Sequence, residues 1–379
     1  MNNLHGIVFG YSTEHQQGLR ELVDHRTAPS IPFGGRYRLI DFVISIMTNA
    51  GVTDIGVLME ERYQSLLDHL GSGKDWDLSR KLGGLKLLPP FALAESRRHK
   101  GSNTYFGVMD ALASVRTYVE RIRQDYVAIA DAMTVANFDL AKVFENHLHM
   151  GADVTAVCIP DDRYIDPSVR FKFGPDGWAT DVKICKEGGP KHVDGIAGLG
   201  FYILSKELLL RMIDDCIEHG EYEFESGVLL RHLHELKIAS YIVPVFAARP
   251  ETTQLYYELS MKLLDGQVRR DLFPRDRTVK TKVRDEAPTY YSPDSHSKNC
   301  LVADGCYIEG DVEDSIIFRG VKIHPGAKVK GCILMQNTVV EAGAELQCVI
   351  TDKDTRIKEG RMLMGHESYP IVISKGSEV

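Results

Sequence analysis

The chain has 379 residues, a formal net charge of −8, and an ordinary balance of 44% hydrophobic and 26% charged residues. This composition is typical of a soluble globular protein of two domains, and it excludes a disordered or collagen-like chain. The acidic excess argues against a nucleic-acid partner or an anionic membrane surface. The longest nearly apolar run, Ile238 to Ala248, contains Pro244 and is far shorter than the roughly 20 residues that span a bilayer.

Neither the N-terminus nor the cysteines indicate an exported protein. The opening sequence MNNLHGIVFG lacks a basic region and a small-residue cleavage site. The seven cysteines are scattered and show no C-x-x-C spacing, so we expect neither a zinc site nor a disulfide framework. These features predict a cytoplasmic protein without a membrane partner.

The first strand and the loop after it follow the pattern of an open α/β sheet. Leu4 to Phe9 is predicted as a buried strand, and the polar loop from Gly10 to Gly18 follows its carboxyl end. In such sheets, backbone amides and a helix N-terminus commonly meet phosphate groups at this place. An ordinary surface loop is the alternative.

Paired glycines and two arginines mark the stretch PSIPFGGRYRLIDF, from Pro29 to Phe42. Glycine permits a tight turn, and Arg36 and Arg38 would place two guanidinium groups beside it, as an anionic ligand requires. The apolar positions that follow predict a helix packed on a core. A turn with solvated arginines is the alternative, and spacing alone does not decide between them.

A short apolar strand, Tyr126 to Ala130, ends in Asp131. A carboxylate at the carboxyl end of such a strand is well placed to bind Mg²⁺. The alternative is a turn or capping residue. Before this strand, the apolar spacing of Thr104 to Arg123 predicts one amphipathic helix.

The pattern changes after the charged, proline-containing run from Asp271 to Ser297. Apolar residues recur at intervals of six, which predicts short strands that form a three-sided coil, and a β-sandwich is the alternative. The two series are Ile317, Ile323 and Val329, and Leu334, Val340 and Leu346.

The stretch from Pro29 to Phe42 resembles the start of the ADP-glucose pyrophosphorylases, or glucose-1-phosphate adenylyltransferases, and the resemblance extends through nearly the whole chain. These enzymes make ADP-glucose and pyrophosphate from ATP and glucose 1-phosphate. The resemblance implies an α/β fold: a Rossmann-like, GT-A-like nucleotidyltransferase domain with a mixed sheet, followed by a left-handed parallel β-helix of hexapeptide repeats. The implied boundaries are 1–250 for the first domain, 251–297 for a helix and extended linker, and 298–379 for the β-helix.

The resemblance also implies a substrate site. Gly10 opens the loop that holds the nucleotide, while Gly107 and Asp110 match the family motif Tyr-x-Gly-Thr-Ala-Asp-Ala, which lies beside adenine. Gly200 and Tyr202 match a motif of the glucose 1-phosphate site.

Two further assignments follow from the resemblance. Asp131 falls on the aspartate of Gly-Asp-His, the metal-binding and catalytic carboxylate. Arg36 follows Gly-Gly, where family members place a basic residue in an effector pocket for a phosphorylated sugar, and Arg38 is its neighbour.

Several chemical positions depart from the family. Gly18, Ala28 and Ser226 stand where the family has an arginine and two lysines. The segment Phe246 to Thr252 faces the motif Trp-x-Asp-Val-Gly-Thr, with no acidic residue at the place of its metal-binding aspartate. We therefore expect that Mg²⁺, the cofactor of the family, is not bound productively. Because this chemistry depends on positioning and charge stabilisation, little activity should remain.

These departures favour a regulatory, largely non-catalytic subunit of the GlgD type in glycogen biosynthesis. Such a chain would assemble with a catalytic GlgC-type subunit, as a heterotetramer, and activate it; a homo-oligomer stays open. One alternative is an independently active sugar-phosphate nucleotidyltransferase that uses relocated residues such as Arg97, Arg98 and Lys100. Another is an acyltransferase that uses His324 of the β-helix as a base.

Overall fold

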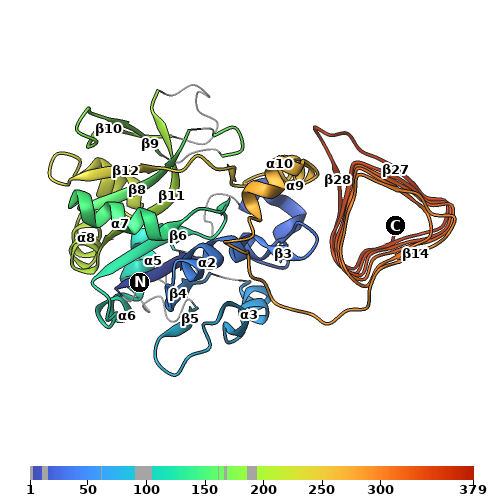
Figure 1. Cartoon of the computed structure of the whole chain (residues 1–379), viewed down its shortest axis with the longest axis horizontal. Coiled ribbons are helices and arrows are strands. Elements are labelled where there is room, and N and C mark those ends of the chain that lie inside the picture. The colour runs from blue at the N-terminus through green and yellow to red at the C-terminus, as the bar shows by residue number, and fades with distance from the viewer. Residues whose placement is uncertain are drawn as a thin grey trace. The chain divides into compact units, whose positions relative to one another are not determined.

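The computed structural model describes most of the chain and divides it into two compact units, each shown as a ribbon in Figure 1. The described residues are 3–10, 16–60, 62–89, 105–160, 162–165, 169–185 and 194–379. Unit 1 comprises Met1–Glu14, Ile40–Arg249 and Phe273–Lys280, and unit 2 comprises His15–Leu39, Pro250–Leu272 and Thr281–Val379. Among these residues, no helix is both long and apolar enough to cross a membrane.

Unit 1 is built on a mixed sheet that has nine strands within the described residues. The order is β10-β9-β11-β6-β1-β4-β5, and β8 pairs with β11 and β12. Strands β4 and β6 run parallel to β1, whereas β11 runs antiparallel to β6, β8 and β9. The strands are β1 (Leu4–Phe9), β4 (Asp54–Leu58), β5 (Gly84–Leu88), β6 (Tyr126–Asp131), β8 (Val154–Ile159), β9 (Val169–Phe173), β10 (Ala179–Ile184), β11 (Ile196–Ser205) and β12 (Ile238–Ile242).

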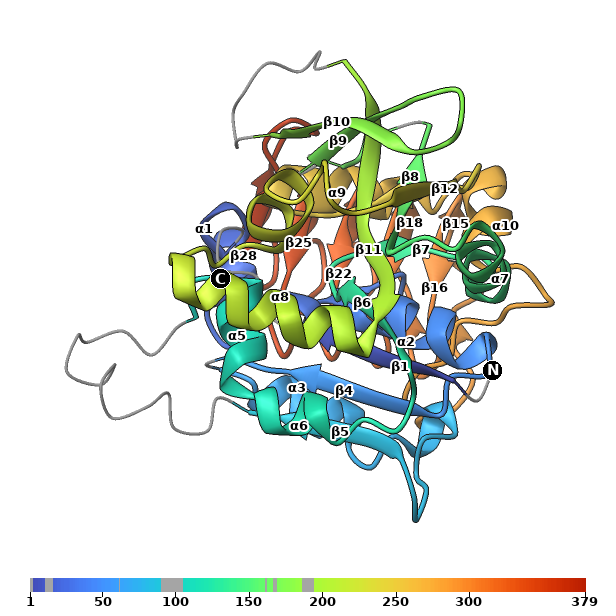
Figure 2. The ribbon, with the colours of Figure 1, turned by 90° about the vertical axis from the view of Figure 1, so that its left-hand side faces the viewer.

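Helices cover both faces of this sheet, and Figure 2 shows α5, α6 and α8 along one of them. Side chains of α2 (Leu39–Asn49), α3 (Gln64–Leu70) and α7 (Leu140–Met150) pack into one hydrophobic core. Side chains of α5 (Val108–Ser114), α6 (Arg116–Glu120) and α8 (Lys206–His219) pack into the other. The predicted α/β fold with a mixed sheet is confirmed.

The single helix predicted from Thr104 to Arg123 is wrong, because the described part contains two helices that meet at Val115. The Ser114 hydroxyl donates to the carbonyl of Ala111 at 2.7 Å, a local bond that competes with helix continuation. Tyr118 N then donates to Val115 O at 2.8 Å and starts the second helix.

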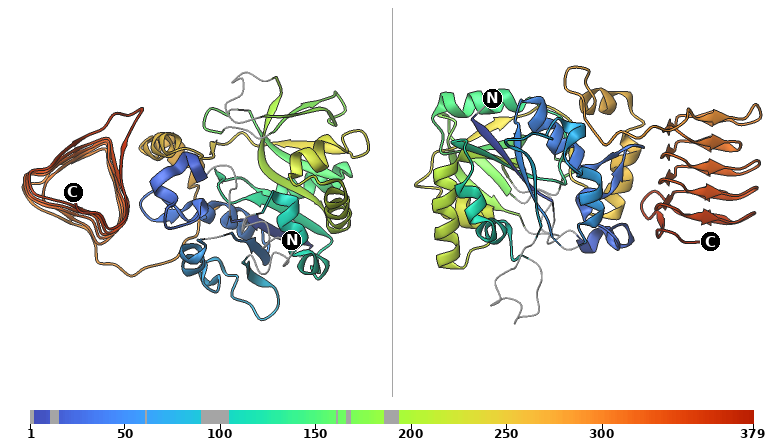
Figure 3. Two further views of the ribbon diagram at one scale, coloured as in Figure 1. Left: turned by 180° about the vertical axis from the view of Figure 1, so that it is seen from behind. Right: turned by 90° about the horizontal axis from the view of Figure 1, so that it is seen from below.

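Unit 2 contains the predicted parallel β-helix, whose stacked coils are seen from the side in Figure 3. The register places Ile317 opposite Leu334, Ile323 opposite Val340, and Val329 opposite Leu346, so the two six-residue series fill one core. One sheet consists of β14 (Tyr290–Tyr291), β17 (Tyr307–Ile308), β20 (Lys322–Ile323), β23 (Val339–Val340) and β26 (Arg356–Ile357). The second has β15 (Ser297–Lys298), β18 (Asp311–Glu313), β21 (Lys328–Lys330), β24 (Glu345–Gln347) and β27 (Met362–Met364), and the third has β16 (Leu301–Val302), β19 (Ile316–Ile317), β22 (Ile333–Leu334), β25 (Val349–Thr351) and β28 (Ile371–Ile373).

Residues 15–39 belong to the same unit as the β-helix. Tyr256 Oη donates to Pro32 O at 2.6 Å, and Tyr257 Oη donates to Gly331 O at 2.6 Å. The paired-glycine turn is therefore held through one helix that also contacts the β-helix. The other elements of this unit are α1 (Gln16–Leu19), β2 (Pro32–Phe33), β3 (Tyr37–Arg38), α9 (Thr253–Lys262), α10 (Gly266–Leu272), and 3₁₀ helices at Arg20–Val23 and Ala28–Ser30.

Short elements complete unit 1. The strands β7 (Val135–Ala136) and β13 (Ala247–Ala248) form an antiparallel pair, a 3₁₀ helix spans Lys74–Trp76, and a π-helical turn spans Glu225–Leu230. The β7–β13 pair matters for the site because it fixes the backbone just before Arg249.

Candidate functional site

Asp131 is the last residue of β6 and lies opposite Phe9 at the carboxyl end of β1. Its Oδ1 accepts a hydrogen bond from Met133 N at 2.8 Å, which stabilises the turn after the strand. The side chain is 25% exposed. The predicted position at the strand end is confirmed, and so is the turn-stabilising bond expected from the alternative interpretation.

The second carboxylate oxygen of Asp131 faces the guanidinium of Arg249. Asp131 Oδ2 lies 3.4 Å from Arg249 Nε, and the arginine side chain is only 3% exposed. Arg249 Nη2 also donates to Leu199 O at 2.8 Å. Its backbone N donates to Tyr164 O at 2.9 Å, so main chain and side chain are both fixed.

Gly200 lies against the same guanidinium. Its φ is +70°, in the left-handed region that favours glycine, and a Cβ there would lie 2.5 Å from Arg249 Nη2 and 3.6 Å from Asp131 Cβ. The structure thus brings the predicted metal ligand Asp131 and the predicted sugar-phosphate residue Gly200 together, and the guanidinium of Arg249 lies against both.

A second carboxylate near this cluster belongs to Glu225, which sequence reasoning missed. It accepts a hydrogen bond from Tyr202 Oη at 3.0 Å. Burial raises the pKa of Glu225; the nearby charge of Arg249 acts to lower it, and that of Asp131 to raise it. Burial also raises the pKa of Tyr202 well above its ordinary value. Tyr202 therefore serves here as a neutral hydrogen-bond donor to a partly buried acid.

The predicted nucleotide-binding residues Gly107 and Asp110 fix the start of α5. Asp110 is buried and accepts a hydrogen bond from Phe106 N at 3.0 Å. A Cβ at Gly107 would lie 2.5 Å from both Tyr222 O and Glu223 Oε1. These contacts give both residues a packing role, and their role beside adenine stays a prediction.

Gly10 is held at the end of β4, where its N donates to Leu58 O at 2.7 Å. Residues 11–15 of the predicted nucleotide loop lie outside the described residues, and so do Arg97, Arg98 and Lys100 of the alternative site.

The described residues around Asp131 do not fit Mg²⁺. This ion prefers an octahedral set of oxygen ligands, with one or two carboxylates. Here one oxygen of Asp131 accepts from an amide and the other faces a guanidinium. In the described part of the chain, no group of three or more Asp, Glu, His or Cys side chains is arranged to hold a metal.

The position of Arg249 could have been found in the sequence. In the family motif Trp-x-Asp-Val-Gly-Thr the aspartate lies three residues before the threonine, and the residue three before Thr252 is Arg249. A cation thus stands where the motif has its second metal-binding carboxylate.

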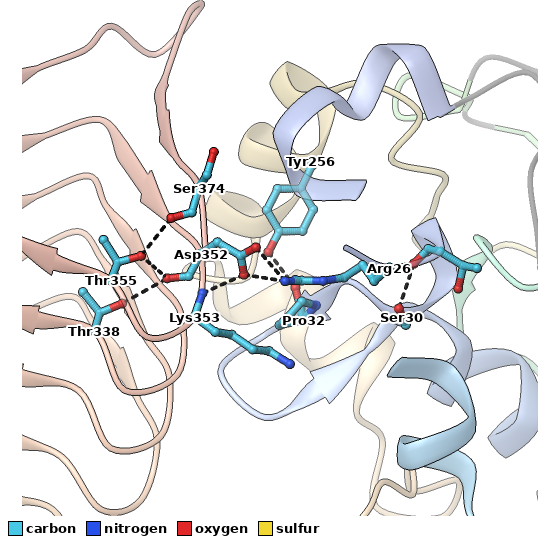
Figure 4. Close-up of polar contacts among 10 residues, drawn as sticks. Arg26, Ser30, Pro32, Tyr256, Thr338, Asp352, Lys353, Thr355 and Ser374 are labelled. Atoms are coloured by element: carbon cyan, nitrogen blue, oxygen red, sulfur yellow. Dashed lines mark hydrogen bonds and ion pairs between the residues drawn. The ribbon is translucent and has the colours of Figure 1, made fainter. Parts of the chain in front are cut away.

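A separate site lies within unit 2, around a buried ion pair between Arg26 and Asp352 (Figure 4). Arg26 Nη2 lies 2.7 Å and 2.6 Å from the two carboxylate oxygens, and both side chains are at most 3% exposed. The carbonyl of Asp352 accepts from the hydroxyl groups of Thr338 at 3.4 Å and Thr355 at 2.7 Å. The β-helix therefore presents this carboxylate in a fixed position.

Further cations surround that pair. Burial, together with the charges of Arg38, Arg26 and Arg284, lowers the pKa of Lys353 to about 7. Burial and the charges of Arg36 and Arg284 also lower the pKa of Arg319, although its Nε lies 3.2 Å from Asp304 Oδ2. We call this set the basic cluster: Arg26, Arg36, Arg38, Arg284, Arg319 and Lys353.

The predicted effector residues Arg36 and Arg38 both lie in the basic cluster, and the other four members were missed. Arg36 is exposed, with its guanidinium 5.6 Å from the centre of the Tyr37 ring. An excess of positive charge in a partly desolvated place is a physical basis for binding a phosphate.

His324, the base of the acyltransferase alternative, lies beside Glu309. Its Nδ1 is 3.4 Å from Glu309 Oε2, and its side chain is 42% exposed. This geometry is that of an ordinary surface pair.

The fold and the site define a nucleotidyltransferase-type α/β unit followed by a hexapeptide β-helix. The family model described as Nucleotidyl transferase matches residues 17–242, and the model described as GlmU-like, C-terminal hexapeptide matches residues 289–368.

Named relatives resemble nearly the whole chain. The glycogen biosynthesis protein GlgD of Bacillus subtilis (strain 168) is 34% identical over 375 residues, which cover 99% of this chain and 96% of the relative. The GlgD protein of Geobacillus stearothermophilus is 35% identical and covers 86% of this chain and 83% of its own length. The glucose-1-phosphate adenylyltransferase of the same organism is 32% identical, with 82% and 80% covered. The chain belongs to the nucleotidyl transferase family, in the branch that includes the GlgD proteins and the glucose-1-phosphate adenylyltransferases.

Proposed function

We propose that this chain is a regulatory, largely non-catalytic subunit of glucose-1-phosphate adenylyltransferase in the cytoplasmic biosynthesis of glycogen. The observation that carries the proposal is the state of Asp131, whose two oxygens face the Met133 amide and the Arg249 guanidinium. The reaction joins a sugar-phosphate oxygen to the α-phosphorus of ATP and releases pyrophosphate. In this family Mg²⁺ stabilises the charge at the phosphates, and the two engaged oxygens of Asp131 do not offer a site for that ion.

A partner chain is supported by the relatives themselves. Geobacillus stearothermophilus has both a GlgD protein and a glucose-1-phosphate adenylyltransferase, and this chain resembles the two to a similar degree. Two chains of one fold therefore coexist in one organism. We propose that this chain likewise assembles with a catalytic homologue, as a heterotetramer, and activates it.

The basic cluster supports a regulatory role. Arg36 is exposed, and burial together with the charges of Arg38, Arg26 and Arg284 lowers the pKa of Lys353 in the same cluster. The phosphate of a phosphorylated sugar would offset the repulsion among these cations. The cations meet only when the second unit is folded, so the sugar would bind the folded unit more tightly than the unfolded chain. We propose this cluster as the effector site, with Arg36 and Arg38 in contact with phosphate.

The test is pyrophosphorolysis of ADP-glucose with Mg²⁺ by this chain, by a catalytic homologue, and by the two mixed. We expect little turnover by the chain alone, and a higher rate or a lower effector requirement in the mixture. Arg36→Ala combined with Arg38→Ala should weaken the effector response of the mixture and leave assembly, measured by size-exclusion chromatography with light scattering, unchanged.

Turnover by the chain alone at an ordinary enzymatic rate, abolished by Asp131→Asn, would contradict the proposal. That result would favour the alternative, an independently active sugar-phosphate nucleotidyltransferase with a rearranged site. The mixture must also be compared with an equal amount of a heat-unfolded sample of this chain, since a rate increase caused by added protein alone would not count as activation.

A further inference from the structure

We infer that Arg249 is a resident cation that occupies the place of a metal ion beside Asp131 and excludes divalent cations from it. The inference concerns why a metal ion does not bind at Asp131, and it holds whether or not the chain assembles with a catalytic partner. It starts from the mismatch between Mg²⁺ and the described residues.

Two strands contact the guanidinium, and a third strand leads into Arg249 itself. Asp131 at the end of β6 faces Arg249 Nε at 3.4 Å, and Leu199 of β11 accepts from Arg249 Nη2 at 2.8 Å. The third strand is β13, which ends one residue before Arg249 and pairs with β7. The side chain is 3% exposed and contacts both β6 and β11, so it keeps one position.

The adjacent backbone approaches this side chain closely. A Cβ at Gly200 would lie 2.5 Å from Arg249 Nη2, so the guanidinium packs directly on the main chain of β11. Because the glycine also has a φ of +70°, a larger residue there would be strained as well as crowded.

A divalent cation would have to displace Arg249 to reach Asp131 Oδ2. Two positive charges at one carboxylate repel each other, most strongly where water is excluded. Displacement would also remove the donor from the Leu199 carbonyl and leave that buried acceptor without this bond. Mg²⁺ keeps several of its waters when bound, so it also needs more space than a guanidinium already packed in place leaves.

The competing explanation is an ion pair that only stabilises the fold. Under that explanation, removing the charge of Arg249 without adding a carboxylate would weaken the protein and would not create affinity for a metal. Metal binding by the variants therefore separates the two explanations.

The experiment uses the full chain and Mn²⁺ as the probe, because Mn²⁺ takes carboxylate ligands and its free concentration is measured directly by electron paramagnetic resonance. The variant Arg249→Asp replaces the cation with a second carboxylate beside Asp131. We expect Mn²⁺ binding at least about 10-fold tighter than in the wild type, a size typical of one gained or lost interaction at a metal site. The double variant Asp131→Asn with Arg249→Asp should lose that gain.

A matched control is Arg116→Asp. Arg116 Nε lies 2.8 Å from Asp214 Oδ1, and Arg116 also pairs with Glu120, so the control makes the same charge change beside two carboxylates at an exposed position. Arg116→Asp should not tighten Mn²⁺ binding as much as Arg249→Asp does. Any Mn²⁺ that binds to Arg116→Asp should bind independently of Asp131.

Arg249→Asp brings two like charges together, so its folding is followed by thermal unfolding with and without Mn²⁺. Mn²⁺ should raise its melting temperature and leave that of the wild type unchanged. The neutral variant Arg249→Gln removes the cation without adding a carboxylate, so it is measured in parallel and also serves if Arg249→Asp does not fold. It should show a smaller gain that still depends on Asp131. The inference is overturned if the wild type already binds Mn²⁺ at Asp131 as tightly as the variants do. It is also overturned if the folded variants gain no binding, or if neither variant folds with or without Mn²⁺.

The Mn²⁺ experiment and the activation assay are separate measurements, although the inference and the proposed function both rest on the arrangement around Asp131. Mn²⁺ binding involves this chain alone, whereas activation is measured in the mixture with a catalytic homologue. Failure of activation in the mixture would leave the inference about Arg249 standing, whereas tight Mn²⁺ binding by the wild type would contradict this inference and also remove the observation that carries the non-catalytic assignment.

Discussion

Replacing Asp352 with alanine should lower the free energy of unfolding by about 3–5 kcal/mol, because it leaves the buried guanidinium of Arg26 without its countercharge. Both side chains are at most 3% exposed, so water cannot take the place of the carboxylate. Two further losses act in the same direction. Lys353 N loses an acceptor at 2.6 Å, and the basic cluster loses the negative charge beside Lys353.

The measurement is urea and thermal unfolding of the wild type and the variant, with Asp214→Ala as the matched control. Asp214 also pairs with an arginine at 2.8 Å, but the two side chains are 52% and 39% exposed. Exposed pairs of this kind contribute at most about 1 kcal/mol. Equal losses from Asp352→Ala and Asp214→Ala would show that burial does not decide the effect, and the argument for the Arg26 pair would be wrong.

Much of the fold could be predicted because it depends on local patterns. The six-residue spacing of Ile317, Ile323 and Val329 follows from the geometry of one coil, and the structure places all three in the same core. Asp131 was likewise placed correctly, because a short apolar run that ends in a polar residue indicates where a strand ends. The helix predicted from Thr104 to Arg123 was wrong, because one serine bond inside the run interrupts it.

The parts that could not be predicted depend on contacts between distant residues. Arg26 and Asp352 are 326 positions apart, and no local pattern connects an arginine near the N-terminus with one turn of the β-helix. The basic cluster follows from that contact, so only Arg36 and Arg38 were anticipated.

Prediction of the site around Asp131 from the sequence was limited in the same way. The sequence indicated that no acidic residue stands at the second metal position, but it did not indicate where Arg249 points. That direction depends on the pairing of β13 with β7 and on the Leu199 carbonyl. A missing ligand is visible in a motif, whereas a side chain that fills the resulting place is visible only in three dimensions.

The second large effect that we expect is a pH dependence of the protein's stability, and it arises from Lys353. In the folded state, burial and its cationic neighbours lower its pKa from the ordinary 10.5 to about 7. Between pH 7 and pH 10.5 the unfolded chain therefore binds more protons at this residue than the folded chain does, and its contribution to stability rises with pH through that window. Below pH 7 both states carry the proton and the full unfavourable contribution of the buried charge is present.

Lys353→Met should consequently stabilise the protein at and below neutral pH, by about 1–3 kcal/mol after allowance for partial exposure of the side chain. The gain should fade as the pH approaches 10. Lys358→Met, which changes a lysine that is 52% exposed, is the control and should leave the pH dependence unchanged. Unfolding midpoints measured from pH 6 to pH 10 give the comparison. A gain from Lys353→Met that does not vary with pH would mean that packing, not charge, is responsible.

The same lysine makes anion binding a proton-linked event. A phosphate bound in the basic cluster favours the charged form of Lys353, so binding near pH 8 should take up a proton, close to one per site at saturation. Calorimetric titration with a hexose bisphosphate in two buffers of different ionisation enthalpy measures this uptake directly. Affinity should fall as the pH rises above 7, because the neutral amine must first be protonated. Lys353→Met should abolish most of the uptake while Lys358→Met retains it. Binding without any uptake by the wild type would place the anion away from Lys353, and the basic cluster would then not be the effector site.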